Sequence, residues 1–460
     1  MPTRTGPKPM ARADNQNVWN FSVNLWDVTF ITLGFSLVSR ETVIPVLVSQ
    51  LTDSKLAIGL VPAMWSLGIY LPQLLTASLA ERMVYKKPFI MYLSLVVERL
   101  PYLLVGLAVL AFAATAPTVA LIALLLGIAV ASTGAGVAIP AWMDMVAKVI
   151  PTRRRGIWLG LGHGLGLMLG VLGAWFVGRV LVGYPFPGNY ARLFFAGFGI
   201  MLISWVGLAL TREPPSETTK EAIPLFRYLR SVGSVLKQDH NFRRYLISKS
   251  LVNLGGMSAG FFAVYGTELF ALDGRGVGLL TAVLVGTQAV LNPLWGMLAD
   301  RVGHKSVLTA TALFIVLAPL SALLLHGAGP VDAPGGAPAA AGIPFWGGVP
   351  LGLLLVFVFL GAYLASDHTS SLNIILEFST PESRPTYVGL TNTLLAPVLI
   401  CAPIFGGWLA GALGYAAMFR VSLAFAVLAL CLMVLWVKEP RRTAPRRLDA
   451  ERPLSVASGT

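Results

Sequence analysis

The amino-acid sequence predicts an all-α membrane protein, with twelve transmembrane helices in two pseudo-symmetric six-helix bundles. Three observations support this prediction. First, 56% of the 460 residues are hydrophobic and only 12% are charged, and the mean hydropathy is +0.74, whereas about a quarter of the residues of soluble domains are charged. Second, apolar runs of 18 or more residues recur along the whole chain, and each can cross a hydrocarbon core of roughly 30 Å as a helix. Third, motifs of the first half return in the second half.

The apolar runs define the predicted membrane spans in chain order. Their limits are 24–50, 57–80, 88–113, 117–143, 156–182, 192–211, 243–270, 276–299, 305–326, 348–375, 386–411 and 416–437. Glycines recur in the fifth span, between Gly160 and Gly170, and their spacing predicts a surface that packs closely against a neighbouring helix. Two cysteines, Cys401 and Cys431, lie inside apolar spans, where they are expected to act as small hydrophobic side chains.

Basic residues are distributed unevenly between the two sides of the predicted membrane. If the N-terminus is cytoplasmic and the spans alternate, the cytoplasmic segments hold 26 of the 34 Lys and Arg residues and the opposite side holds five. This asymmetry follows the positive-inside rule and predicts that both termini are cytoplasmic. The net charge of +13 therefore reflects membrane topology, and no nucleic-acid partner is expected.

An internal repeat divides the chain into two units. The sequence LAER, from Leu79 to Arg82, returns as LADR at 298–301, and the sixth and twelfth spans are followed by REP (212–214) and KEP (438–440). Such duplication is common in transporters. We therefore expect a cytoplasmic tail (1–20), an N-terminal six-helix bundle (21–211), a cytoplasmic linker (212–242), a C-terminal six-helix bundle (243–437) and a basic cytoplasmic tail (438–460).

The decapeptide GMLADRVGHK, from Gly296 to Lys305, resembles the signature G-x-L-A-D-R-x-G-R-K of the major facilitator superfamily. The matching residues are Gly296, Leu298, Ala299, Asp300, Arg301, Gly303 and Lys305, and His304 replaces the usual arginine. The resemblance implies two helical bundles that rock about a central cavity, with the motif acting as a conformational latch. In the N-terminal copy, Glu81 and Arg82 keep the charges, while Ala77 and Val84 replace the glycines.

Ionisable residues inside the predicted spans are candidates for function, because charges at membrane depth are costly unless they face a cavity or a partner. The candidates for substrate binding or proton coupling are Asp27, Arg40, Glu41, Asp367 and His368. The resemblance supports these five, since it places the first, fourth, seventh and tenth helices around the central cavity. It places the third helix, with Glu98 and Arg99, outside that cavity.

Glu98 and Arg99 are therefore expected to form interhelical charge pairs with residues of other helices, and a role in transport is the alternative. Sequence neighbours point about 100° apart on an α-helix, so neither Arg40 with Glu41 nor Glu98 with Arg99 is expected to pair directly. The prediction is that the first and third spans exchange a pair, either Arg40 with Glu98 or Glu41 with Arg99.

The function that the sequence predicts is secondary active transport of a small organic solute by alternating access, with proton-coupled efflux as the favoured direction. Uptake and facilitated diffusion are alternatives, and a non-transporting membrane receptor or scaffold on the same fold is the alternative from another class. Aromatic residues and mixed charges suit an amphipathic solute.

Motifs for covalent chemistry, nucleotide binding and metal binding were not found, so the sequence predicts no enzyme, no cofactor and no metal site. The expected partners are membrane lipids, a small-molecule substrate and protons as the coupling ion. We expect a monomeric multi-pass protein of the cell membrane, either a plasma membrane or a bacterial inner membrane.

Overall fold

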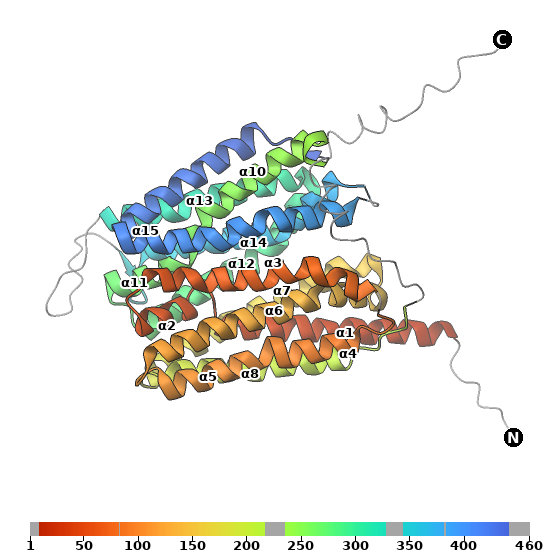
Figure 1. The fold of residues 1–460 in the computed structure, drawn as a ribbon, viewed down its shortest axis with the longest axis horizontal. Coiled ribbons are helices and arrows are strands. Elements are labelled where there is room, and N and C mark those ends of the chain that lie inside the picture. Colours follow the sequence, from red (N-terminus) through yellow and green to blue (C-terminus); the bar gives the residue numbers. More distant parts are fainter. Residues whose placement is uncertain (1–8, 82, 217–234, 328–343, 381–382, 441–460) are drawn as a thin grey trace, which may run out of the picture.

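The computed structural model describes residues 9–81, 83–216, 235–327, 344–380 and 383–440. The first bundle contains α1 (Pro9–Leu37), α2 (Val43–Leu51), α3 (Lys55–Glu81), α4 (Lys87–Tyr92), the π-helix η1 (Leu93–Arg99), α5 (Leu100–Phe112), α6 (Pro117–Val149), α7 (Thr152–Gly183) and α8 (Gly188–Ala209). These helices form the lower group in Figure 1, and their long axes run roughly side by side.

The second bundle contains α10 (His240–Gly255), the 3₁₀-helix η2 (Gly256–Phe261), α11 (Phe262–Phe270), α12 (Gly274–Val302), α13 (His304–Gly327), α14 (Leu351–Phe378) and α15 (Arg384–Leu435). A short hairpin of β1 (Phe345–Trp346) and β2 (Val349–Pro350) precedes α14. The two bundles meet through α7 with α12 and through α3 with α15. The fold prediction of an all-α protein with two helical bundles is confirmed.

Nine helical stretches among the described residues are long and apolar enough to cross a membrane. The longest, Thr386–Leu435, covers both the eleventh and the twelfth predicted spans. Its backbone leaves helical geometry at Gly414, where φ is 81°, a conformation that glycine adopts without steric cost. The first and seventh predicted spans are not among the nine, because the chain there forms α1 with α2, and α10 with η2 and α11.

Prolines explain the irregular helices of the first bundle. Pro45 cannot donate a hydrogen bond to the carbonyl of Glu41, and α1 and α2 are separated by the non-helical residues 38–42. Pro101 likewise cannot donate to the carbonyl of Val97, and the preceding turns widen into η1. Both irregular segments carry ionisable residues.

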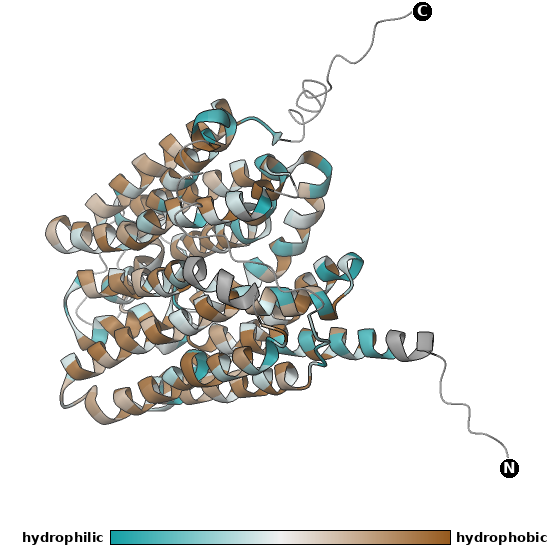
Figure 2. Ribbon diagram, turned by 45° about the vertical axis from the view of Figure 1, so that its right-hand side comes forward, coloured by the Kyte–Doolittle hydropathy of each residue, from teal (hydrophilic) through white to brown (hydrophobic). Residues whose placement is uncertain are grey.

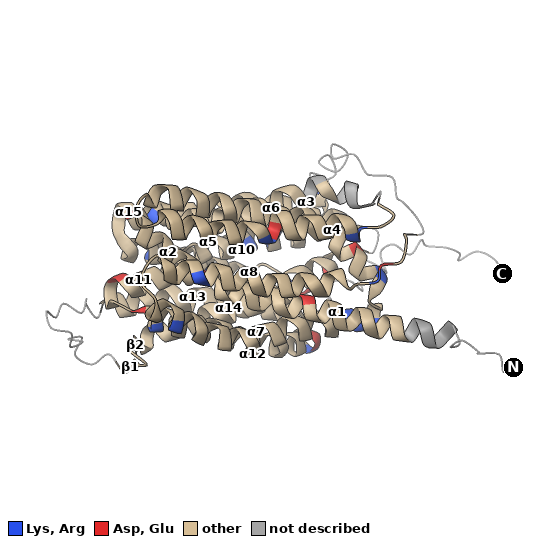
Figure 3. Ribbon diagram, turned by 90° about the horizontal axis from the view of Figure 1, so that it is seen from below, with Lys and Arg blue, Asp and Glu red and all other residues tan. Residues whose placement is uncertain are grey.

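Apolar and polar residues are arranged along the bundle axis as a membrane protein requires. Hydrophobic residues cover the length of the helices, and hydrophilic residues gather toward the end from which both described terminal segments leave (Figure 2). Figure 3 shows Lys, Arg, Asp and Glu mainly at the two ends, with few along the helices. The few charges at mid-depth are therefore the ones that need an explanation.

Candidate functional site

The two bundles touch each other at the end of the molecule opposite to the termini, which we call the closed end. Lys55, at the start of α3, forms an ion pair with Glu268 of α11 across the bundles. The Tyr415 hydroxyl donates a 3.0 Å hydrogen bond to the second carboxylate oxygen of Glu268. Deeper in the same region, the hydroxyls of Thr42 and Thr281 lie 2.7 Å apart, in different bundles.

Glycines allow the backbones of the two bundles to approach closely at the closed end. A Cβ atom at Gly59 of α3 would lie 2.2 Å from the Pro403 carbonyl oxygen of α15, and one at Gly278 of α12 would lie 2.7 Å from the Cα of Gly178. Larger residues at these positions would push the bundles apart.

At the other end, which we call the open end, the same helix faces do not touch. Gly156, Gly160 and Gly164 lie on the face of α7 that contacts α12 through Gly178, because Gly160 precedes Gly178 by five helical turns and the other two lie one turn to either side of Gly160. A Cβ atom at any of these three positions would meet no heavy atom within 4 Å, and neither would one at Gly296 of α12. The bundles are thus packed at the closed end and separated at the open end.

Arg40 and Glu41 lie in the break between α1 and α2. The Arg40 guanidinium is 3.7 Å from the Glu41 carboxylate and 4.2 Å from the centre of the Trp65 ring. The Ser39 hydroxyl also donates to the Glu41 carboxylate. The expectation that these neighbours do not pair is wrong, because the chain here is not helical and the 100° rule does not apply.

Asp27, Glu98 and Arg99 form a buried group, which we call the N-half triad. The Arg99 guanidinium lies 3.0 Å from the Glu98 carboxylate and 3.6 Å from that of Asp27. The first and third spans share a charge pair, but it joins Asp27 to Arg99, so the two predicted pairings are wrong. Neither Arg40–Glu98 nor Glu41–Arg99 is an ion pair here. The expectation that Glu98 and Arg99 do not pair directly is also wrong, because the widened helix η1 places these neighbours within reach of each other.

Hydrogen bonds fix the Arg99 side chain, which is only 3% exposed. It donates to the Met201 and Ser94 carbonyl oxygens, both at 2.9 Å, and to the Ser204 hydroxyl at 3.0 Å. The Ser204 hydroxyl in turn donates to Asp27 at 2.6 Å. A buried arginine held in this way provides a fixed positive charge.

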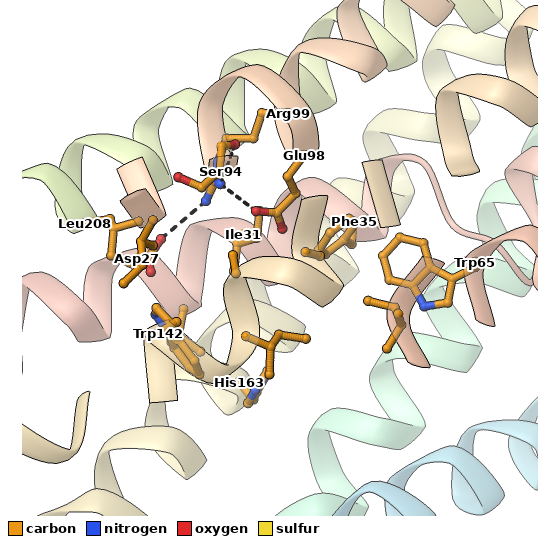
Figure 4. A pocket seen from close by; sticks show the side chains of 16 residues that line it. Asp27, Ile31, Phe35, Trp65, Ser94, Glu98, Arg99, Trp142, His163 and Leu208 are labelled. Atoms are coloured by element: carbon orange, nitrogen blue, oxygen red, sulfur yellow. Dashed lines mark hydrogen bonds and ion pairs between the residues drawn. The ribbon is translucent and has the colours of Figure 1, made fainter. Parts of the chain in front are cut away.

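The triad borders a cavity of about 240 Å³ that the first bundle forms alone, and we call it the N-half cavity. Aromatic and aliphatic side chains from α1, α3, α4, α6 and α8 line most of it, and α7 contributes His163. Figure 4 shows Glu98, Phe35, Trp65, Trp142 and His163 around this space.

The second bundle carries a separate charged pair. Lys249 of α10, which is buried, donates to the Asp367 carboxylate of α14 and also to the Ser371 hydroxyl at 2.9 Å. The next residue, His368, faces the other bundle, and its ring centre lies 5.0 Å from that of His163 in α7. Asp367 and His368 therefore point to different neighbours, although they are adjacent in sequence.

Arg40 of the first bundle and Asp367 of the second bundle have a common neighbour in Tyr70. The phenol of Tyr70, on α3, interacts electrostatically with both side chains. We call this region the central space, and define it by Arg40, Trp65, Tyr70, Asp367 and His368. Tyr70 and Trp65 are only partly buried.

In each bundle, one glutamate follows the last helix and lies against the start of another helix of that bundle. The Glu213 carboxylate accepts hydrogen bonds from the backbone N–H groups of Lys86 and Lys87, at 2.8–3.0 Å, and pairs with Lys148 at 2.9 Å. In the second bundle, the Glu439 carboxylate occupies the space beside Gly303.

The decapeptide motif connects helices of the second bundle. Gly303 has φ of 92°, which suits glycine at the turn between α12 and α13. His304 contacts the Ser370 hydroxyl at 3.2 Å, and Lys305 donates to the Val434 carbonyl oxygen at 3.3 Å. Asp300 and Arg301 are exposed. In the N-terminal copy, Arg82 lies outside the described residues, and so does the side chain of Glu81.

Comparison with known proteins agrees with this architecture. Residues 246–459 match the sequence model of the Major Facilitator Superfamily. A point mutant of the nucleoside transporter NupG is similar to 90% of the chain over 98% of its own length, with a TM-score of 0.66 and 12% identity. The C-terminal part of the chain therefore matches the major facilitator superfamily, and most of the chain shares the fold of these solved transporters.

Two structures of sugar transporters of this superfamily are similar as well. A D-xylose–proton symporter matches 94% of the chain over 98% of its own length, with a TM-score of 0.60 and 13% identity. The xylose transporter XylE from E. coli, in a partially occluded inward-open conformation, matches 93% of the chain over 97% of its own length, with a TM-score of 0.60 and 14% identity. No curated protein sequence matches the chain.

Both findings agree with the sequence prediction of a multi-pass membrane transporter that is not an enzyme. Sequence reasoning missed the contact of Asp27 with the third span and the two helix-start glutamates. The repeated REP and KEP segments already contained Glu213 and Glu439, but their partners are distant in sequence. The glycine surface of the fifth span is divided, because Gly162, Gly166 and Gly170 pack against α1 whereas Gly160 and Gly164 meet nothing.

Proposed function

We propose that the protein is a secondary active transporter that moves a small organic solute across the cell membrane by alternating access. The observation that carries the proposal is the unequal contact between the bundles. They pack tightly around Gly59 and Gly278 but stand apart beyond Gly164. A rocking motion that closes the open end and parts the closed end exposes a solute between the bundles first to one side and then to the other.

The solute site in this proposal includes the central space. It offers a guanidinium at Arg40, a carboxylate at Asp367, an imidazole at His368 and the aromatic faces of Trp65 and Tyr70. These groups suit a small organic molecule with polar and aromatic or apolar parts. NupG and the xylose symporter carry a nucleoside and a sugar, as their names state, but this chain shares with them the fold alone.

Protons are the proposed coupling ion, and Asp27, Glu41 and Asp367 are the candidate carboxylates. The proposed direction is export, with uptake as the same cycle run in reverse. We further propose a monomer in a plasma membrane or bacterial inner membrane, with the open end and both termini in the cytoplasm. The excess of Lys and Arg in the segments on that side supports this orientation.

A cross-link across the closed end tests the proposal. Cys401 and Cys431 are first replaced by serine, and Lys55→Cys with Glu268→Cys is then introduced, since these residues already form an ion pair between the bundles. The matched control is Glu268→Cys with Tyr415→Cys, whose partners lie in the second bundle alone. Flux is measured in proteoliposomes with labelled nucleosides, sugars, amino acids and organic amines.

Oxidation of the first pair is expected to lower flux at least tenfold, and a reductant is expected to restore it, because the bundles can no longer part. The control pair is expected to keep its flux. Equal flux with and without the inter-bundle disulfide would contradict alternating access. Saturable binding of a solute without any flux would instead identify a receptor on the same fold.

A further inference from the structure

Only helices of the first bundle line the N-half cavity, which adjoins the second bundle at His163, beside His368. Its volume of about 240 Å³ is below the range of about 300–1,000 Å³ that is typical of pockets for drug-sized ligands. A ligand for this cavity is therefore small.

The N-half triad has one negative charge in excess. Asp27 and Glu98 are two acids, and Arg99 is the one base that lies between them. Asp27 and Arg99 are 5% and 3% exposed, and an uncompensated charge at such a depth is costly. One further positive charge is needed beside the triad, and either a bound proton or a cationic ligand can supply it.

The arrangement leaves room for that charge at Glu98. One carboxylate oxygen of Glu98 accepts from Arg99, and the other has no hydrogen-bond partner within the described part of the chain. Glu98 also lines the cavity, and Figure 4 shows its carboxylate beside Ile31 and Phe35. Arg99 cannot turn to cover the second oxygen, because the Met201 and Ser94 carbonyl oxygens hold its guanidinium.

The remaining walls of the cavity suit the apolar part of an organic cation. Phe35, Trp65 and Trp142 supply aromatic faces, and Ala135 and Ala138 leave space between them. Aromatic rings stabilise a cation within about 6 Å of the ring centre, by about 2 kcal/mol or more where water is excluded.

We propose that the N-half cavity binds a small monovalent organic cation with an aromatic or aliphatic body, and that this cation and one proton on the N-half triad exclude each other. The inference rests on the proposed function and names its solute class. It also sets the sign of coupling, because a site that holds either the proton or the cation exchanges one for the other across the membrane.

Other titratable groups around the cavity are few among the described residues. His163 of α7 faces it and contacts the Thr32 hydroxyl at 3.2 Å. Arg40 and Glu41, toward α2, neutralise each other. The parts of α3, α6 and α8 that line the cavity contribute no ionisable side chain. A protonated His163 also opposes a cation, so its contribution has to be separated from that of the triad.

Equilibrium binding to the purified full-length protein tests the inference without any flux. The probe is benzyltrimethylammonium, whose charge is permanent, and benzylsulfonate is the anion of similar size. We expect saturable binding of the cation alone, with about one proton released per cation bound in a weakly buffered solution. Its Kd is expected to rise by up to about tenfold for each pH unit of acidification. Lack of cation binding, or binding without proton release, would overturn the inference.

Four variants locate the exchange. Glu98→Gln leaves the Asp27–Arg99 pair intact but removes the excess negative charge, so we expect Kd to rise at least tenfold and proton release to stop. Ala138→Leu fills the cavity, and we expect it to weaken cation binding without touching the triad. The exposed carboxylate variant Asp53→Asn is the control with unchanged binding. His163→Asn is expected to release a proton on cation binding as the unmodified protein does. If this variant released no proton, the proton would belong to the histidine and the inference would be contradicted.

The outcomes separate this inference from the proposed function. If the closed-end disulfide stops flux of another solute while benzyltrimethylammonium does not bind, only the cation site is wrong. If the cation binds and releases a proton but no solute is transported, the site is correct and the transport proposal fails.

Discussion

At the residue scale, Arg99 shows how a charge is tolerated at membrane depth. Its guanidinium donates to two backbone carbonyl oxygens and to Ser204, and it pairs with two carboxylates. Because a planar guanidinium can serve several acceptors at once, the cost of burying it is offset by charge-assisted hydrogen bonds. The position of this one side chain then determines where Asp27 and Glu98 lie.

Glu213 plays a comparable part near the open end. Its carboxylate is 2% exposed and accepts from two backbone N–H groups at the start of α4 and from Lys148. A negative charge at a helix start also interacts favourably with the helix dipole. The glutamate therefore ties the segment that follows α8 to α4 and α6.

Replacement of Glu213 is predicted to destabilise the first bundle. Glu213→Ala leaves the backbone N–H groups of Lys86 and Lys87 and the Lys148 ammonium without their acceptor. We expect the free energy of unfolding to fall by about 2–3 kcal/mol, as for the loss of hydrogen bonds to charged groups. Thermal unfolding of the purified protein measures the loss, with the exposed Asp53→Ala as control. Equal melting temperatures for the two variants would show that Glu213 does not stabilise the bundle.

At the element scale, the irregular segments of the first bundle carry four of its ionisable residues at membrane depth. Arg40 and Glu41 lie in the break before Pro45, and Glu98 and Arg99 lie in η1 before Pro101. In both places proline removes a backbone donor, and the altered geometry allows sequence neighbours to pair. A continuous α-helix would point these neighbours in different directions.

The glycine face of α7 predicts how the open end closes. A Cβ atom at Gly160 would meet no heavy atom within 4 Å. For Gly160→Leu we therefore expect thermal stability to be unchanged or higher by up to about 1 kcal/mol, because leucine favours helix over glycine. It is expected to block the approach of α12 and to lower flux at least tenfold. Gly199→Leu on α8, which also meets no atom within 4 Å, is the control. Equal flux in both variants would exclude closure through this face.

At the scale of the whole molecule, the two ends differ in contact and in charge. The closed end is held by Lys55 with Glu268 and by close glycine contacts. Both described terminal segments leave from the open end (Figure 1). An exposed ion pair such as Lys55–Glu268 contributes only about 0–1 kcal/mol, so it can break during a cycle without a large barrier.

Orientation in the membrane is predicted from these ends. In the protein without its native cysteines, Asp53→Cys at the closed end is expected to react with an impermeant maleimide on intact cells. Ser306→Cys at the open end is expected to react only after the membrane is permeabilised. Both positions are exposed, so access decides the result. Labelling of Ser306→Cys on intact cells would reverse the proposed topology.

The fold was largely predictable because a bilayer allows few solutions. Backbone polar groups must be satisfied within the helices, and long apolar runs therefore report spans directly. The irregular first and seventh spans were less predictable, since the consequences of Pro45 and of η2 depend on the neighbouring helices. In the candidate site, Asp27, Glu98 and Arg99 were each recognised from their charge in an apolar run, but their grouping was not.

The sequence by itself determined the membrane class, the two-bundle architecture and which side chains carry charge at depth, because these properties follow from composition and from periodicity along one chain. Only the tertiary structure decided that Asp27 pairs with Arg99, that Arg40 and Asp367 are both neighbours of Tyr70, and that the bundles touch at one end. Those facts depend on distances between helices that are far apart in sequence, and a local pattern does not contain them.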